Sequence, residues 1–101
     1  PGTALLLIPS GPSAGARYLL DEEQFAVGRA PDADIVLDDV TVSRRHAEFI
    51  RRNNTFEIVD QASLNGTYVA RQLVDQAKLR TGDEVMIGKY RLTYYAAPTK
   101  A

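Results

Sequence analysis

Short extended segments separated by turn-forming residues are the feature that most limits what this chain can fold into. Residues 46–52 alternate in polarity, as a strand with one buried face does, and residues 55–59 continue the pattern. The asparagine pair between them tolerates the left-handed backbone angles of a tight turn. The two segments therefore predict a hairpin, in which Ala47, Phe49 and Arg51 share one face of the first strand, and Phe56 and Ile58 share one face of the second.

The same punctuation continues along the whole chain. Clusters of Gly, Pro, Asn, Asp and Ser recur at intervals of ~8 to 12 residues, and no sustained helical period is present. This pattern predicts an all-β sandwich or barrel, in which we expect the first and last strands to pair. The expected strands are 3–8, 17–20, 24–27, 35–37, 46–52, 55–59, 67–69, 84–87 and 90–95, with room for one further short strand within the less regular residues 72–79.

Length and composition indicate one small domain. A chain of 101 residues that is 45% apolar can bury a real core. We expect a single domain over residues 1–101, with its core at about 4–95 and a frayed tail at 96–101. Because the chain begins at Pro1 and not at Met, we expect this domain to be excised from a longer protein.

Charge and residue usage exclude several classes of function. The net charge of −1 lacks the global basic field of non-specific nucleic-acid binders. The absence of cysteine excludes disulfides, thiolate metal sites and cysteine catalysis, and it fits a reducing, cytoplasmic compartment. No apolar run is long enough to span a bilayer, and no signal peptide is present.

Two groups of hydrogen-bond donors follow apolar runs in the first half of the chain. Arg29 comes directly after Gly28, and its planar, permanently charged guanidinium matches phosphate oxygens two at a time. Ser43 offers a hydroxyl and a backbone amide, and Arg44 adds charge beside it. Such donors suit a dianion with several acceptor oxygens. His46 closes the group, where we expect it to support its own loop by hydrogen bonds.

A third group, Ser63-Leu64-Asn65-Gly66-Thr67, lies further along the chain. Asn65 carries a donor and an acceptor on one short side chain, which suits the main chain of an extended peptide. Gly66 permits a turn, and a plain Asn-Gly turn is the alternative interpretation of this group.

Taken in order, these three groups on a series of short strands resemble the forkhead-associated (FHA) domain family. The resemblance covers about residues 4 to 95. It implies a β-sandwich of about eleven short, mostly antiparallel strands that binds phosphothreonine peptides through loops at one end. It also implies a binding module with no enzymatic activity, cofactor or metal.

The resemblance assigns roles to individual residues of this chain. Arg29 matches the main phosphate-binding arginine of the family, and Ser43 matches its phosphate-binding serine. Arg44 matches a variable position that often contacts phosphate or peptide main chain. Asn65 matches the asparagine that holds the peptide backbone just after the phosphothreonine. The positions that shape the loops are Gly28, His46 and Gly66.

One position departs from the family pattern. Many members have a threonine before the Asn-Gly pair, and its side chain touches the phosphate, whereas this chain has Leu64. That contact must be lost here, so we expect Arg44 to contribute more to phosphate binding in this chain. We expect selectivity for the residues around the phosphothreonine to involve Leu64 together with Thr41, Gly88 and Lys89.

Within the family, the chain is similar to small actinobacterial regulators of 2-oxoglutarate metabolism. The similar stretches are residues 37–49, 63–69, 82–84 and 87–89. The resemblance implies a place in serine/threonine kinase signalling, in which the domain recruits or regulates partner proteins and can be switched by a phosphorylated tail of its own parent. The expected partner is a phosphothreonine protein, such as a serine/threonine kinase or its substrate. We expect a monomer that contacts neither nucleic acid nor membrane.

Three other hypotheses stand beside this one. A phosphorylation-independent interaction scaffold would use the same loops or another face. Nucleic-acid binding would use the basic residues Arg44, Arg45, Arg51 and Arg52. On alternating faces of a strand, however, these side chains point in different directions. A hydrolase would use Ser43 and His46, but no nucleophile-elbow motif surrounds them.

Overall fold

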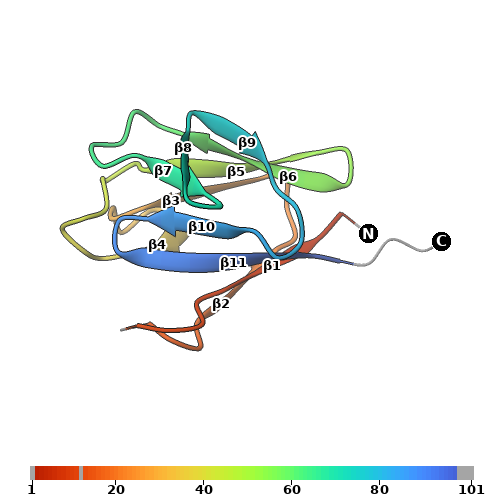
Figure 1. Cartoon of the computed structure of the whole chain (residues 1–101), viewed down its shortest axis with the longest axis horizontal. Coiled ribbons are helices and arrows are strands. Elements are labelled where there is room, and N and C mark those ends of the chain that lie inside the picture. Colours follow the sequence, from red (N-terminus) through yellow and green to blue (C-terminus); the bar gives the residue numbers. More distant parts are fainter. Residues whose placement is uncertain (1, 12, 98–101) are drawn as a thin grey trace.

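Two β-sheets packed face to face make up the described part of the chain, residues 2–11 and 13–97, in the computed structural model (Figure 1). The six-stranded sheet has the order β2 (Arg17–Leu20), β1 (Ala4–Leu7), β11 (Tyr90–Ala96), β10 (Glu84–Ile87), β7 (Thr67–Val69) and β8 (Gln72–Val74). The five-stranded sheet has the order β4 (Ile35–Val36), β3 (Gln24–Gly28), β5 (Ala47–Arg52), β6 (Thr55–Asp60) and β9 (Gln76–Lys78). The predicted all-β sandwich of about eleven strands is confirmed.

The strand pairing follows the prediction closely. Within the described residues, β3 and β4 form the one parallel pair, and the other neighbours are antiparallel. The first and last strands pair as expected, with Ala4 opposite Ala96 and Leu7 opposite Thr93. β5 and β6 form the predicted hairpin, in which Asn53 adopts a φ of 61°.

The segment 72–79 differs from the prediction. It holds two strands, β8 and β9, and they belong to different sheets. Asp75 lies between them, and its carbonyl accepts a hydrogen bond from the Asp60 amide at 2.8 Å. β8 and β9 have three residues each, too few to show an alternation of their own, and Asp75 alone separates them, so the sequence did not reveal the change of sheet. Elsewhere the bounds shift slightly: β11 includes Ala96, and residues 98–101 of the predicted tail lie outside the described residues.

The core lies between the sheets and is built from the inward-facing residue of each alternating pair. Phe49, Phe56 and Ile58 come from the five-stranded sheet and are fully buried. Tyr94 meets them from β11, and its hydroxyl accepts a hydrogen bond from the Phe56 amide at 3.3 Å. Burial raises the pKa of the Tyr94 hydroxyl, so this polar link between the two sheets stays uncharged.

Four connecting segments gather at one end of the sandwich, on the left of Figure 1. They are the β3–β4 loop (29–34), the β4–β5 loop (37–46), the β6–β7 loop (61–66) and the β10–β11 turn (88–89). The start of β1 and the end of β11 lie at the opposite end (Figure 1). The described residues contain no helix long and apolar enough to cross a membrane.

Candidate functional site

One hollow at the loop end brings together the residues that the sequence singled out. Its volume is about 180 Å³, and its walls come from the β3–β4, β4–β5 and β6–β7 loops. Arg29, Ser43, Arg44 and Asn65, the four residues predicted to hold a phosphopeptide, all line it. The remaining lining residues are Val40, Thr41, Val42 and Leu64.

Arg29 is held at the edge of this hollow by the neighbouring loop. Its amide donates to the Ser43 carbonyl at 3.0 Å, and its side-chain Nε donates to the Val42 carbonyl at 3.0 Å. Gly28 makes this contact possible, because a Cβ there would lie 2.1 Å from the Arg44 carbonyl oxygen. No described residue accepts a hydrogen bond from the terminal guanidinium nitrogens of Arg29, so they are available to an anion.

Ser43 and His46 link two loops. The buried His46 ring accepts a hydrogen bond from the Ser43 amide at its Nδ1 (3.1 Å), so its hydrogen lies on Nε2, which donates to the Gly66 carbonyl at 2.8 Å. The Ser43 amide is thus committed to His46, which corrects the expectation that this amide serves a phosphate. The Ser43 hydroxyl accepts a hydrogen bond from the Leu64 amide at 2.9 Å, and its own hydrogen is left to donate.

Asn65 completes the polar wall. Its Nδ2 donates to the Thr41 carbonyl at 2.9 Å, which fixes the amide plane and leaves Oδ1 free to accept. Gly66 follows with a φ of 83°, a left-handed angle that suits glycine and turns the chain into β7. A main-chain amide of a bound peptide is the natural donor for the free Oδ1.

Hydrogen bonds to Asp60, a residue that carries no functional motif in the sequence, support the β6–β7 loop. Its carboxylate accepts hydrogen bonds from the Ser63 amide and hydroxyl and, at 2.7 Å, from the Thr67 hydroxyl. Burial acts to raise the pKa of Asp60, but these hydrogen bonds prevail, and the pKa lies below its ordinary value of 3.8. The ionised carboxylate therefore holds the loop that presents Asn65.

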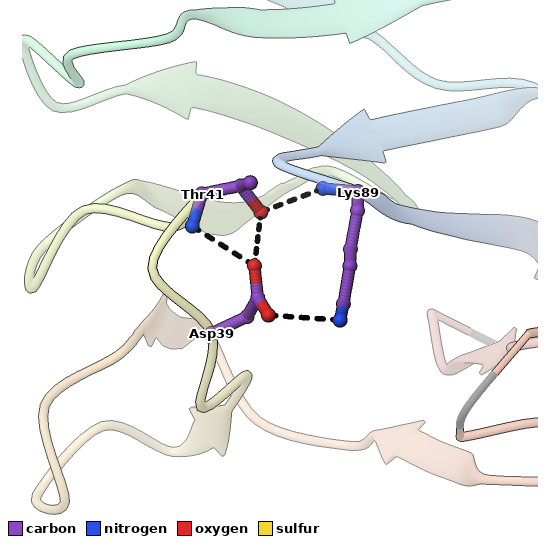
Figure 2. A network of polar contacts seen from close by, with 3 residues as sticks. All are labelled: Asp39, Thr41 and Lys89. Carbon is purple, nitrogen blue, oxygen red and sulfur yellow. Dashed lines mark hydrogen bonds and ion pairs between the residues drawn. The ribbon is translucent and has the colours of Figure 1, made fainter.

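A second carboxylate, Asp39, holds the β4–β5 loop against the β10–β11 turn (Figure 2). It accepts hydrogen bonds from the Thr41 amide at 2.9 Å and hydroxyl at 2.6 Å, and it pairs with Lys89 Nζ at 2.8 Å. The Thr41 hydroxyl in turn accepts from the Lys89 amide at 2.9 Å. The hydrogen bond and charge of Lys89 hold the pKa of Asp39 well below its usual range, and Asp39 raises that of Lys89.

This network engages three of the four residues proposed for peptide selectivity. Thr41 and Lys89 direct their polar groups at Asp39 or at each other, and Gly88 packs against Thr41, where a Cβ would lie 2.5 Å from its hydroxyl. Of the four, Thr41 and Leu64 line the hollow, where Thr41 is half-buried and the Leu64 side chain is exposed. An Asp followed two residues later by Thr is a known turn pattern and was a readable sign of the Asp39–Thr41 contact. The pairing of Asp39 with Lys89, which is distant in sequence, left no such sign.

The geometry gives little support to the catalytic and nucleic-acid hypotheses. Both ring nitrogens of His46 are engaged by main-chain groups, so neither is placed to act as a base for the Ser43 hydroxyl. Arg51 pairs with Glu23 and Arg52 with Glu57, away from Arg44 and Arg45. Among residues 2–11 and 13–97, no three histidine or carboxylate side chains gather as a metal site would require.

Comparison with known families supplies the identification. The sequence model of the FHA domain matches residues 25–88, a stretch that contains Arg29, Ser43, His46 and Asn65. This chain belongs to the FHA domain family. The resemblance inferred from the three motifs is therefore confirmed.

Curated relatives share most of the chain. The glycogen accumulation regulator GarA of Mycobacterium tuberculosis (strain H37Rv) is 60% identical over 98 residues, which cover 97% of this chain and 60% of that protein. An oxoglutarate dehydrogenase inhibitor of Corynebacterium jeikeium is 58% identical over 93 residues, covering 92% of this chain and 65% of that protein. The FHA chain thus spans less than two thirds of the length of these relatives, both of which are named as regulators or inhibitors.

A solved FHA structure confirms the architecture. The chain superposes with a TM-score of 0.87 and 31% identity on a structure from an analysis of phosphothreonine-dependent FHA domain interactions. The match covers 96% of this chain and 99% of the other. The likeness therefore extends over both sheets and the loops at the end of the sandwich.

Proposed function

We propose that this domain binds phosphothreonine peptides and acts as a recognition module in serine/threonine kinase signalling. The observation that carries the proposal is that Arg29, Ser43, Arg44 and Asn65 line one open hollow. In this proposal Arg29 and Arg44 bind the phosphate, the Ser43 hydroxyl donates to one of its oxygens, and Asn65 Oδ1 accepts a peptide amide.

The charge and the donors suit this ligand. A phosphothreonine carries about −1.5 to −2 charges near pH 7 and three acceptor oxygens. Each hydrogen bond to a charged group contributes roughly 1.5 to 3 kcal/mol. Three or four such bonds support micromolar affinity after the cost of association is subtracted, on the order of −8 kcal/mol of binding free energy.

The wider role of the parent protein is part of the same proposal. The domain recruits or regulates a phosphorylated partner in the cytoplasm and catalyses no reaction of its own. A phosphorylated threonine in the tail of its parent would compete for the same hollow and switch the partner off. The names of the relatives as a regulator and an inhibitor agree with this role.

Calorimetry with one threonine peptide, phosphorylated and unphosphorylated, tests the proposal. We expect only the phosphorylated peptide to bind, and Arg29→Ala to weaken binding at least about tenfold, a loss of ~1.4 kcal/mol or more. Arg29→Lys keeps the positive charge but loses the paired donors, so we expect an intermediate loss. Arg17→Ala, an exposed arginine on β2, is the matched control and should bind normally.

The outcomes separate the proposal from its main rival. Normal binding by Arg29→Ala would show that the phosphate site is elsewhere. Equal binding of both peptides would favour the phosphorylation-independent scaffold. Circular dichroism of each variant would confirm that the sandwich is intact.

A further inference from the structure

We propose that this chain selects phosphothreonine peptides with apolar side chains close to the phosphothreonine, and that Val40 and Leu64 are the residues that contact them. This inference rests on the proposed function and adds the class of ligand to it. Thr41, Gly88 and Lys89 are held by contacts within the protein, so the inference assigns peptide selectivity to Val40 and Leu64 in their place.

The exposure of the two residues is the first observation. Among the described residues, Val40 (91% exposed) and Leu64 (88%) are the two most exposed large apolar side chains, and the next is Leu73 at 65%. They come from different loops, yet both line the hollow that contains Arg29, Ser43 and Asn65. Large apolar side chains in water beside a polar site are typical of a surface that is covered when a ligand binds.

The second observation is that both side chains stand on fixed backbone. Val40 lies between Asp39 and Thr41, which are joined by two hydrogen bonds. The Leu64 amide is bound to the Ser43 hydroxyl, and the residues on either side of Leu64 are bound to Asp60 and to the Thr41 carbonyl. A ligand would therefore meet preorganised apolar contacts and would not have to order these loops.

The distance to the phosphate site limits which peptide residues can be contacted. Leu64 is hydrogen-bonded to Ser43 and so lies beside the phosphate donors. Val40 is three residues from Ser43, which the chain can span with roughly 10 Å at most. An extended peptide advances about 3.3 Å per residue. Both contacts therefore fall within about three residues of the phosphothreonine.

Local charge argues for apolar side chains and against acidic ones at Val40. Asp38 is exposed directly before Asp39 and Val40, and it would repel a peptide carboxylate. Lys89, the cation that would attract a carboxylate there, is already paired with Asp39. An aliphatic or aromatic side chain would cover Val40 without being repelled by Asp38 and without needing a cation.

A substitution scan of a phosphothreonine peptide tests the inference. The reference peptide carries alanine at the three positions on each side of the phosphothreonine, and each alanine is changed singly to leucine and to glutamate. Affinity is measured by fluorescence anisotropy against the unmodified chain and against Val40→Ser and Leu64→Ser. The control is Leu19→Ser, an exposed leucine (59%) on β2 at the far edge of the six-stranded sheet.

We expect leucine at one or more positions to tighten binding at least about fivefold, as burial of an apolar side chain would, and glutamate not to do so. That gain should fall to below about twofold in Val40→Ser or Leu64→Ser, and it should persist in Leu19→Ser. Leu19→Ser should also bind the all-alanine peptide with unchanged affinity, because it lies outside the hollow. For Val40→Ser and Leu64→Ser, the leucine gain is taken relative to the affinity of the same variant for the all-alanine peptide.

Three results would overturn the inference, and each has a different consequence. A flat leucine scan with binding that still needs phosphate and Arg29 would remove the apolar selectivity and leave the proposed function standing. A leucine gain that survives in both Val40→Ser and Leu64→Ser would place the apolar contact elsewhere. Absence of binding by every phosphopeptide would remove the proposed function and the inference together.

Discussion

At the residue scale, the orientation of Asn65 decides what the site offers a peptide. Its Nδ2 donates to the Thr41 carbonyl, so the acceptor oxygen of the amide is the group left to bind a ligand. The residue type matters here because only an amide presents a donor on one arm and an acceptor on the other. An aspartate has the same shape but would place an oxygen against the carbonyl of Thr41.

We therefore expect Asn65→Asp to weaken phosphopeptide binding at least about tenfold, and more than Asn65→Ala does. The aspartate loses the contact with Thr41 and sets a negative charge beside a dianion, whereas alanine only loses the hydrogen bonds. Calorimetry with the phosphorylated peptide measures the difference. Asn54→Asp, an exposed asparagine in the β5–β6 turn, is the matched control. Equal affinities for Asn65→Asp and the unmodified chain would show that this amide does not contact the peptide.

The same scale shows what sequence could predict about the site. Arg29, Ser43, Arg44 and Asn65 were predicted because their residue types and order carry the chemistry, and they do line one hollow. The predicted use of the Ser43 amide was wrong, because His46 Nδ1 accepts its hydrogen. Asp60 went unrecognised, since a carboxylate that supports a loop has the same appearance in sequence as one that is merely solvated. Asp39 went unrecognised because its pairing with Lys89 is distant in sequence, and Val40 because its exposure is visible only in the structure.

At the scale of elements, the β7–β8 turn is the most unusual connection. It has two residues, Ala70 and Arg71, with φ angles of 50° and 67°. Both central residues of this kind of hairpin turn need a positive φ, which is why Asn-Gly is the preferred pair. Alanine and arginine pay a steric cost for these angles.

Replacing this pair with Asn-Gly should stabilise the fold. We expect Ala70→Asn combined with Arg71→Gly to raise the free energy of unfolding by about 1 kcal/mol, because the new residues accept left-handed angles more readily. Urea denaturation measures the change. Arg71→Ala removes the same charge but keeps a Cβ, so it should leave stability nearly unchanged. No gain in the Asn-Gly variant would mean that the turn is already relaxed.

Element prediction succeeded where a strand showed its period or, as for β4 and β7, formed a short apolar segment between turn-forming residues. β5 and β6 have six residues each, and their alternation and the Asn53 turn were readable. β8 and β9 have three residues each, and the sequence offered no sign that the chain changes sheets at Asp75. The sequence also gave no reason to expect a turn at Ala70-Arg71, because neither residue is a turn former.

At the scale of the whole molecule, the site exists only when the two sheets are stacked. The hollow uses two loops of the five-stranded sheet and the β6–β7 loop, which joins the two sheets. The β10–β11 turn of the six-stranded sheet supports the β4–β5 loop through Asp39 and Lys89 (Figure 2). Contacts between residues so distant in sequence leave no local pattern. That the three motifs lie together was predicted from the family resemblance, whereas the strands were predicted from the periodicity of the sequence.

Asp60 stands where the chain passes from one sheet to the other. It ends β6, and its carboxylate binds Ser63 and the buried Thr67 at the start of β7. Because its pKa is lower in the folded protein than its ordinary value of 3.8, the folded state favours the ionised form. The stability that results is fully present above pH ~4 to 5 and is lost as the pH falls through the lowered pKa.

Asp60→Asn should therefore reduce the free energy of unfolding by about 1 kcal/mol at pH 7, since one acceptor oxygen becomes a donor. The deficit should shrink as the pH is lowered toward 3, because Asp60 in the unmodified protein then loses its own advantage. Urea denaturation between pH 7 and pH 3 measures both curves, with Asp21→Asn, an exposed carboxylate in the β2–β3 turn, as the control. A deficit that stays constant across this range would show that the charge of Asp60 does not stabilise the crossing, and that the loss in Asp60→Asn comes from the altered hydrogen bonds alone.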